Sequence, residues 1–212
     1  MTAALLTLAD SRLPAGGHTH SGGVEQAIAA GLVHDPSSLA GFLLRRLQTS
    51  GRVAAGLAAA ACRGGDLTML DAEADARTPS PALRAASRQQ GRGLVRVGRR
   101  AWPSPVWDAL PPAPHHPVAL GVAAAAGGLT PRDAAAAAAY LSVSGPATAA
   151  QRLLAMDPLT VAAVTARLAP DIDAVAEGGL RSAPGSLPAD TDPLLDLLAE
   201  VHTARKDRFF AS

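Results

Sequence analysis

Two histidines in a glycine-rich segment, His18 and His20, are the residues whose type and spacing most directly suggest chemistry. Histidines two positions apart on an extended segment can face one metal ion, but a catalytic zinc ion needs a third protein ligand and an open position. The candidates for a third ligand are Asp10, Glu25, His34 and the adjacent His115 and His116. None stands at a recognisable ligand spacing, so we predict no stable metal site. A small metal-dependent hydrolase that uses His18 and His20 stays open as an alternative.

The glycines of the same segment raise two further chemistries. Backbone N–H groups at a helix start bind anions, but the chain lacks the G-x-x-x-x-G-K-S/T pattern of a phosphate-binding loop, and residues 91–93 form no dinucleotide fingerprint. Ser11 and Ser21 lack the G-x-S-x-G context of a nucleophilic serine. The sequence therefore predicts a protein that hydrolyses no nucleotide by itself and is not an enzyme.

A shaped structural loop is the better explanation of this segment. Its two glycine pairs permit left-handed backbone and the close approach of a neighbouring segment. We expect the loop to enter a helix near Ser21, with His20 ordering it through hydrogen bonds. The residues assigned to the loop are Asp10, Ser11, Gly16, Gly17, His20, Ser21, Gly22, Gly23 and Glu25.

Arginines recur at spacings of three and four in one predicted helix, namely Arg84, Arg88, Arg92, Arg96, Arg99 and Arg100. On one helix face each like-charge pair costs roughly 0.2–0.5 kcal/mol, so this stripe would gain from an acidic partner. An ordinary solvated face is the alternative. A helical nucleic-acid binder that uses Arg84 to Arg100 is disfavoured, because Trp102 is the only aromatic residue nearby.

The end of the chain, near residues 205–212, carries Arg208, Phe209 and Phe210. Aromatic and arginine residues are the usual anchors of protein interfaces. Residues 178–193, rich in Gly, Pro, Ser and Asp, predict a flexible linker before the last helix. We therefore expect a docking tail with little local core to receive its two phenylalanines.

Composition bounds the class of protein. A chain of 212 residues suits one domain, here residues 1–212, and a formal net charge of +1 gives no signal for bulk attraction to nucleic acid. Cys62 is the single cysteine, which excludes an internal disulfide and fits a reducing compartment. No run approaches the roughly 18 apolar residues of a membrane span. We expect a cytoplasmic protein with no membrane partner.

Helical hydrophobic spacing over nearly the whole chain predicts an all-α, single-domain bundle of about eight to ten helices. The expected helices cover about 36–61, 67–74, 81–100, 116–126, 130–144, 149–169 with a break near Pro158, and 194–202. Prolines between positions 103 and 114 predict a loop around Trp107.

Residues 8–25 resemble the N-terminal signature of the UreF-type urease accessory proteins, in which an Asp-Ser pair and a Leu-Pro precede two glycine pairs and a closing glutamate. Four later blocks resemble the same family in the same order, at 87–92, 116–121, 139–153 and 202–212. The chain departs from the family pattern at His18, at Thr203 and at Asp157 with Pro158.

The resemblance implies a non-enzymatic urease maturation protein. The family's members form dimers, bridge a second accessory protein (UreD, also called UreH) to the GTPase UreG, and help couple GTP hydrolysis to nickel insertion into apo-urease. The resemblance also implies that Tyr140 and Arg152 lie near the surface shared with these partners, although the residue types by themselves favour structural core residues whose polar ends are satisfied internally. The expected partner-binding residues are Arg88, Arg92, Tyr140, Arg152, Arg208, Phe209 and Phe210. We expect a homodimer with no stably bound cofactor, and at most a transient contact with nickel.

Overall fold

The computed structural model describes residues 3–10, 12–182 and 184–211, and this part of the chain is helical with no strand. The α-helices are α1 (Ala3–Ala9), α2 (Val24–Ala29), α3 (Pro36–Arg46), α4 (Arg52–Cys62), α5 (Leu67–Ala76), α6 (Pro81–Ala101), α7 (His116–Ala126), α8 (Pro131–Leu153), α9 (Pro158–Arg167), α10 (Ala169–Arg181) and α11 (Pro193–Ala204). A π-helical turn, Leu47–Gly51, joins α3 to α4, so the two form the single long helix that the sequence predicts. The predicted all-α class is confirmed.

Local hydrogen bonds explain why the helices begin where they do. Asp35 accepts the Ser38 N–H at 2.7 Å and Thr130 accepts the Asp133 N–H at 3.2 Å, each as half of a capping box with proline at the first helical position. Asp157, one of the departures from the family pattern, caps α9 in a similar way by accepting the Thr160 N–H at 3.0 Å. The helix starts predicted near positions 36, 67, 81, 116, 130 and 194 are confirmed, whereas no helix begins at 149.

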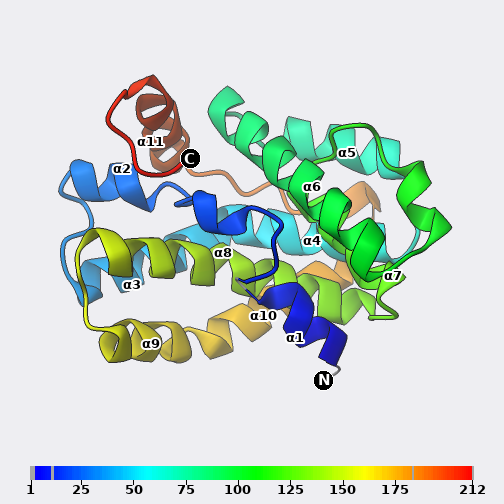
Figure 1. Ribbon diagram of the computed structural model, residues 1–212, viewed down its shortest axis with the longest axis horizontal. Coiled ribbons are helices and arrows are strands. Elements are labelled where there is room, and N and C mark those ends of the chain that lie inside the picture. Colours follow the sequence, from blue (N-terminus) through cyan, green and yellow to red (C-terminus); the bar gives the residue numbers. More distant parts are fainter. Residues whose placement is uncertain (1–2, 11, 183, 212) are drawn as a thin grey trace.

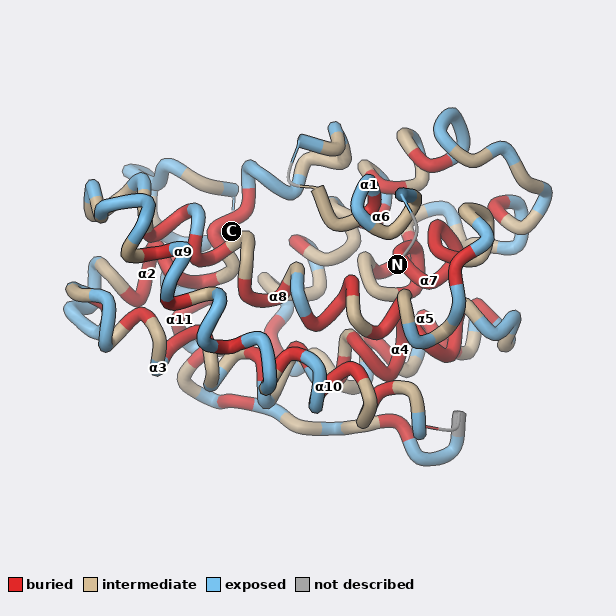
Figure 2. The backbone as a smooth tube through the Cα atoms, turned by 90° about the horizontal axis from the view of Figure 1, so that it is seen from below, coloured by how far each residue is buried: buried red, intermediate tan, exposed pale blue. Residues whose placement is uncertain are grey.

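Helix α4 lies at the centre of the bundle, where it packs against α7, α8 and α10 (Figure 2). Small residues allow these axes to come close together. A Cβ on Gly121 of α7 would stand 2.3 Å from the Ala58 carbonyl oxygen, and one on Gly179 of α10 would stand 2.8 Å from the Ala55 carbonyl carbon. The alanine-rich sequences are therefore helix-packing surfaces.

Helix α8 runs unbroken through Pro146, where the sequence predicts an end near position 144 and a new helix from 149. Proline has no N–H, so the carbonyl four residues earlier loses its helical donor. Here that carbonyl belongs to Ser142, and the Arg46 Nε–H donates to it at 3.0 Å. A side chain from α3 thus replaces the missing backbone donor, which no local pattern in α8 could reveal.

The first residues of the predicted linker, 178–193, are helical, because α10 continues to Arg181. Beyond it, Leu187 and Asp192 are buried. The Arg77 Nε–H donates to the Pro188 carbonyl at 2.9 Å, and the Arg45 Nη2–H donates to Asp192 at 2.7 Å. The segment therefore has long-range partners that its composition does not predict, and its flexibility stays a prediction.

Helix α11 packs against α2 and α6, so the last helix lies over the glycine-rich N-terminal segment (Figure 1). The C-terminal segment thus reaches α2 and the glycine-rich segment, whereas α1 and the N-terminus lie at the opposite edge of the molecule (Figure 1). None of the helices in the described ranges is both long and apolar enough to cross a bilayer.

Candidate partner-binding site

The glycine-rich loop has the left-handed backbone that its composition predicts, at Gly16, Gly22 and Gly23, with φ of 86°, 61° and 89°. At Gly22 there is also no room for a side chain, because a Cβ would stand 2.7 Å from Cγ of Pro146 in α8. Helix α2 begins at Val24, just after the second glycine pair. Ser11, the remaining serine of the predicted loop, lies outside the described residues.

The carboxylate of Glu25, on the first turn of α2, binds the end of the chain. Its Oε1 accepts the Phe209 N–H at 2.7 Å, and its Oε2 accepts the Phe210 N–H at 3.0 Å and bonds His202 Nε2 at 2.9 Å. Burial alone raises the pKa of this carboxyl, but the Phe209 N–H, the His202 ring and the Phe210 N–H together lower it below its ordinary value. The carboxylate is therefore charged and satisfied at neutral pH.

Two further contacts dock the tail on the same region. The Ala211 N–H donates to the Thr19 carbonyl at 2.7 Å, and Arg205 Nη1 donates to Gln26 Oε1 at 3.1 Å. Phe210 packs against the core, so the expectation of little local core for the tail's phenylalanines is wrong for this residue. Phe209 points to solvent and is 86% exposed.

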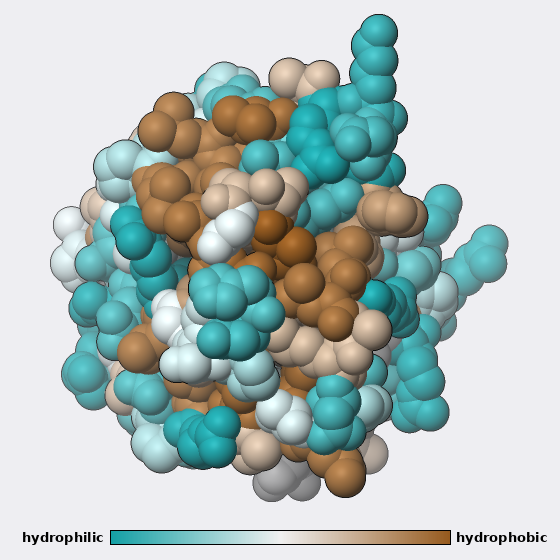
Figure 3. All heavy atoms as spheres, turned by 90° about the vertical axis from the view of Figure 1, so that its left-hand side faces the viewer, coloured by the Kyte–Doolittle hydropathy of each residue, from teal (hydrophilic) through white to brown (hydrophobic). Residues whose placement is uncertain are grey.

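Other large apolar side chains are also exposed on α11 and after α2. Helix α11 exposes Leu197 and Val201, one turn apart, and the segment after α2 exposes Leu32. Figure 3 shows a broad apolar region on the side of the molecule where α2, α3, α9 and α11 lie. Monomeric soluble proteins rarely expose large contiguous apolar patches, and such patches mark interaction sites.

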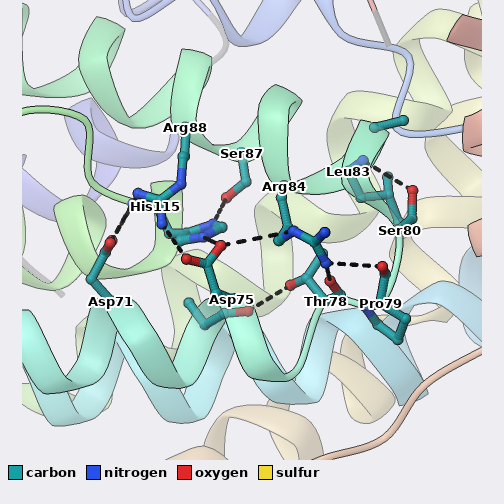
Figure 4. Close-up of polar contacts among 12 residues, drawn as sticks. Asp71, Asp75, Thr78, Pro79, Ser80, Leu83, Arg84, Ser87, Arg88 and His115 are labelled. Carbon is teal, nitrogen blue, oxygen red and sulfur yellow. Dashed lines mark hydrogen bonds and ion pairs between the residues drawn. The ribbon is translucent and has the colours of Figure 1, made fainter.

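The predicted arginine stripe on α6 does not form one free face. Arg88 bonds Asp71 at 2.9 Å and Asp75 at 2.5 Å, both on α5 (Figure 4). Arg84 donates to the Thr78 carbonyl at 2.7 Å, and Arg99 also has an acidic partner within the chain. The stripe is thus corrected to a mixture of internally paired arginines and exposed ones, which are Arg92, Arg96 and Arg100.

Sequence analysis missed the acidic pair Asp71 and Asp75 that binds Arg88. Their spacing of four on a predicted helix, with the arginines on the next helix, is the signal that could have found them. Burial raises the pKa of Asp75, but the hydrogen bonds from His115 and Arg88 outweigh it and the pKa is lowered.

His115 lies between Ser87 and Asp75 in an order that resembles a catalytic triad. Nδ1 is 3.0 Å from the Ser87 hydroxyl and Nε2 is 2.8 Å from Asp75. However, the Ser87 hydroxyl also accepts the His116 N–H at 3.1 Å, and Arg88 already holds Asp75. The cluster therefore joins α5, α6 and the start of α7, and its geometry serves packing.

The two remaining predicted partner residues, Tyr140 and Arg152, are exposed and both lie on α8, not on adjacent helices as expected. His18 is exposed while His20 is buried, and burial, with His18 as a smaller cause, lowers the pKa of His20 to about 4. Within the described residues, no three His, Cys, Asp or Glu side chains gather around one possible metal position.

Comparison with known proteins agrees with the resemblance seen in the sequence. The UreF family model matches residues 33–169. A urease accessory protein UreF from Mycolicibacterium vanbaalenii is 54% identical over 214 residues, which cover 99% of this chain and 98% of the relative. UreF proteins from Mycobacterium marinum and Mycobacterium tuberculosis are 53% and 49% identical over 212 residues, with the same coverage. The chain therefore belongs to the UreF family of urease accessory proteins, which are not enzymes.

Proposed function

We propose that this protein is an adaptor in urease maturation. It bridges a second accessory protein of the UreD or UreH type to the GTPase UreG and helps couple GTP hydrolysis to nickel insertion into apo-urease. The observation that carries the adaptor role is the docked tail, which holds its backbone on Glu25 and leaves the Phe209 side chain in solvent.

The geometry of the tail favours tight docking. Burying the Phe209 ring in a partner contributes about 1.5–3 kcal/mol. In a disordered tail, the entropy cost of ordering the backbone would offset much of this free energy. Hydrogen bonds already hold the backbone at residues 209–211, so its entropy cost on binding is smaller. The tail and α11 therefore form the surface for the second accessory protein.

A separate surface on α8 and α6 serves the GTPase. Tyr140 and Arg152 are exposed there without internal hydrogen bonds in the described part of the chain, and Arg92 is an exposed cation on α6. Arginine and tyrosine are favoured interface anchors.

The homodimer belongs to this proposal too. So does a transient contact with nickel as cargo, for which His18 is the exposed histidine in the loop.

Co-expression with the three neighbouring urease proteins tests the proposal. Phe209→Ala should leave the melting temperature unchanged and lower the affinity for the second accessory protein at least tenfold. Leu6→Ala, on α1, is the matched control because it removes an exposed apolar side chain at the opposite edge of the molecule (Figure 1). Equal binding by wild type and Phe209→Ala, or no co-purification of any partner, would contradict the proposal.

A further inference from the structure

A cavity of about 670 Å³ lies between α6 and α11 on one side and α4 and α8 on the other. Its wall includes Arg46 of α3, and the guanidinium rests on the glycine loop. A Cβ on Gly22 would stand 3.3 Å from Arg46 Cζ, so the missing side chain of that glycine makes room for the cation. Sequence analysis assigned no role to Arg46.

Arg46 has no acidic partner among the described residues. Its Nε–H donates to the Ser142 carbonyl, and no acceptor there binds Nη1 or Nη2. Burial lowers the pKa of Arg46 to about 10, with no contribution from a neighbouring carboxylate. The guanidinium is half-buried and the four Nη N–H bonds have no acceptor within the described chain, so they are available to a ligand or to water.

Of the acidic residues that line the cavity, three pair with arginines other than Arg46. Asp10 binds Arg12, Asp190 binds Arg52 and Asp192 binds Arg45. Asp196 faces the α11 end, where burial and the charges of Asp192 and Glu200 raise its pKa. The charge of Arg46 is therefore not neutralised from within the cavity.

The polar side chains that line this cavity include histidines. His20 and His116 line the same cavity, and burial lowers the pKa of each to about 4. At neutral pH each ring is uncharged and carries one N–H. A cavity wall that holds the Arg46 guanidinium and neutral imidazoles suits an anion better than a divalent cation.

We propose that this cavity binds a small oxyanion, with Arg46 Nη1 and Nη2 donating paired hydrogen bonds to two of its oxygens. The planar fork of arginine matches carboxylate, bicarbonate and phosphate oxygens. The anion comes either from solution or from an acidic side chain that a partner inserts. The inference does not depend on the adaptor role, because the isolated chain contains all the groups named.

Titration of the purified full-length chain with sodium sulfate, phosphate or bicarbonate tests the site, with sodium chloride at matched ionic strength as the reference. We expect saturable heat in calorimetry and a melting temperature that rises with the oxyanion but not with chloride. Arg46→Lys keeps the charge and can still donate to the Ser142 carbonyl, but it loses the fork, so it should weaken binding at least tenfold. Arg132→Gln, which removes an exposed arginine paired with Glu177, should bind as wild type.

The outcomes separate the two sources. Saturable binding to the free chain assigns the site to a dissolved anion. If the free chain binds none, but the complex with the second accessory protein is lost in Arg46→Lys and is competed by sulfate, a partner carboxylate occupies the site. The inference is overturned if wild type shows no saturable binding and Arg46→Lys assembles normally. Even if the variant fails to fold, the wild-type titration decides whether the free chain binds a dissolved anion.

Discussion

The Glu25 carboxylate binds three donors from the opposite end of the chain, two of them backbone N–H groups at sequence separations of 184 and 185. A charged acceptor strengthens each bond relative to a neutral one. The closing glutamate of the N-terminal signature is therefore the residue that holds the tail in place. Its role as a loop residue, which the sequence predicts, is only part of what it does.

Glu25→Gln tests this role. The amide keeps one acceptor oxygen but turns an NH2 group toward donors, so the variant should lose about 1–3 kcal/mol of unfolding free energy. Amide exchange at residues 209–211 should become much faster. Glu177→Gln, on the exposed side of α10, should change stability by less than about 0.5 kcal/mol. Unchanged exchange in Glu25→Gln would show that the tail is held by other contacts.

Tail docking should also depend on pH. The pKa of Glu25 is lower in the folded protein than the ordinary glutamate value, so its stabilisation is complete above the unfolded pKa of about 4.3 and is lost as pH falls through the folded value. Unfolding free energies measured between pH 7 and pH 3 should fall more steeply for wild type than for Glu25→Gln. Parallel curves for the two proteins would rule out this carboxylate as a source of the acid sensitivity.

At the scale of elements, α6 is bound to its neighbours in two ways. An ion pair acts at one residue, and close packing acts at glycines, where no side chain intervenes. Arg88 reaches the two aspartates of α5, while Gly91 and Gly98 let a loop backbone and the Trp107 ring pack directly on the helix. Arginines at regular spacing on α6 therefore have different roles, because some pair within the chain and others face solvent.

Arg88→Ala and Arg92→Ala should differ although both remove an arginine from the same predicted stripe. Arg88→Ala leaves the buried Asp71 without its cation and should cost about 1–3 kcal/mol. Arg92→Ala should stay within about 0.5 kcal/mol of wild type, because exposed charges contribute little to folding. Urea unfolding measures both, and similar losses in the two variants would restore the single-face interpretation.

Helical glycines provide a second matched pair. A Cβ on Gly91 would stand 1.9 Å from the Pro114 carbonyl oxygen, so Gly91→Ala should destabilise the fold by about 1–3 kcal/mol through overpacking. A Cβ on Gly178 of α10 meets nothing within 4 Å, so Gly178→Ala should stabilise by up to about 1 kcal/mol through helix propensity. Melting temperatures moving in the same direction would contradict the packing of α6 on this loop.

At the scale of the whole molecule, α11 and the tail lie on one side of the bundle, while α8, although largely buried, exposes Tyr140 and Arg152. An adaptor that holds two partners at once needs two such surfaces on one rigid body. The alanine-rich centre supplies the rigidity, because close-packed helices transmit strain and resist deformation.

The isolated protein should hydrolyse neither GTP nor urea, and it should bind Ni²⁺ no tighter than micromolar. The chain has no phosphate-binding loop, and exposed His18 and buried His20 offer an incomplete ligand set. Calorimetry with nickel checks the second point, with the double variant His18→Ala and His20→Ala as control. A nanomolar site that disappears in this variant would revive the metal-dependent alternative.

The sequence alone determined the helical class, most helix starts, the left-handed glycines and the family, because caps, N-terminal prolines and positive φ depend on neighbouring residues. Only the tertiary structure decided that Arg88 pairs with α5, that Arg46 supports α8 at Pro146, and that Glu25 binds the tail. These bonds join residues 17, 96 and 184 positions apart. Which distant donor meets which acceptor follows from how the helices pack, and no local pattern encodes it.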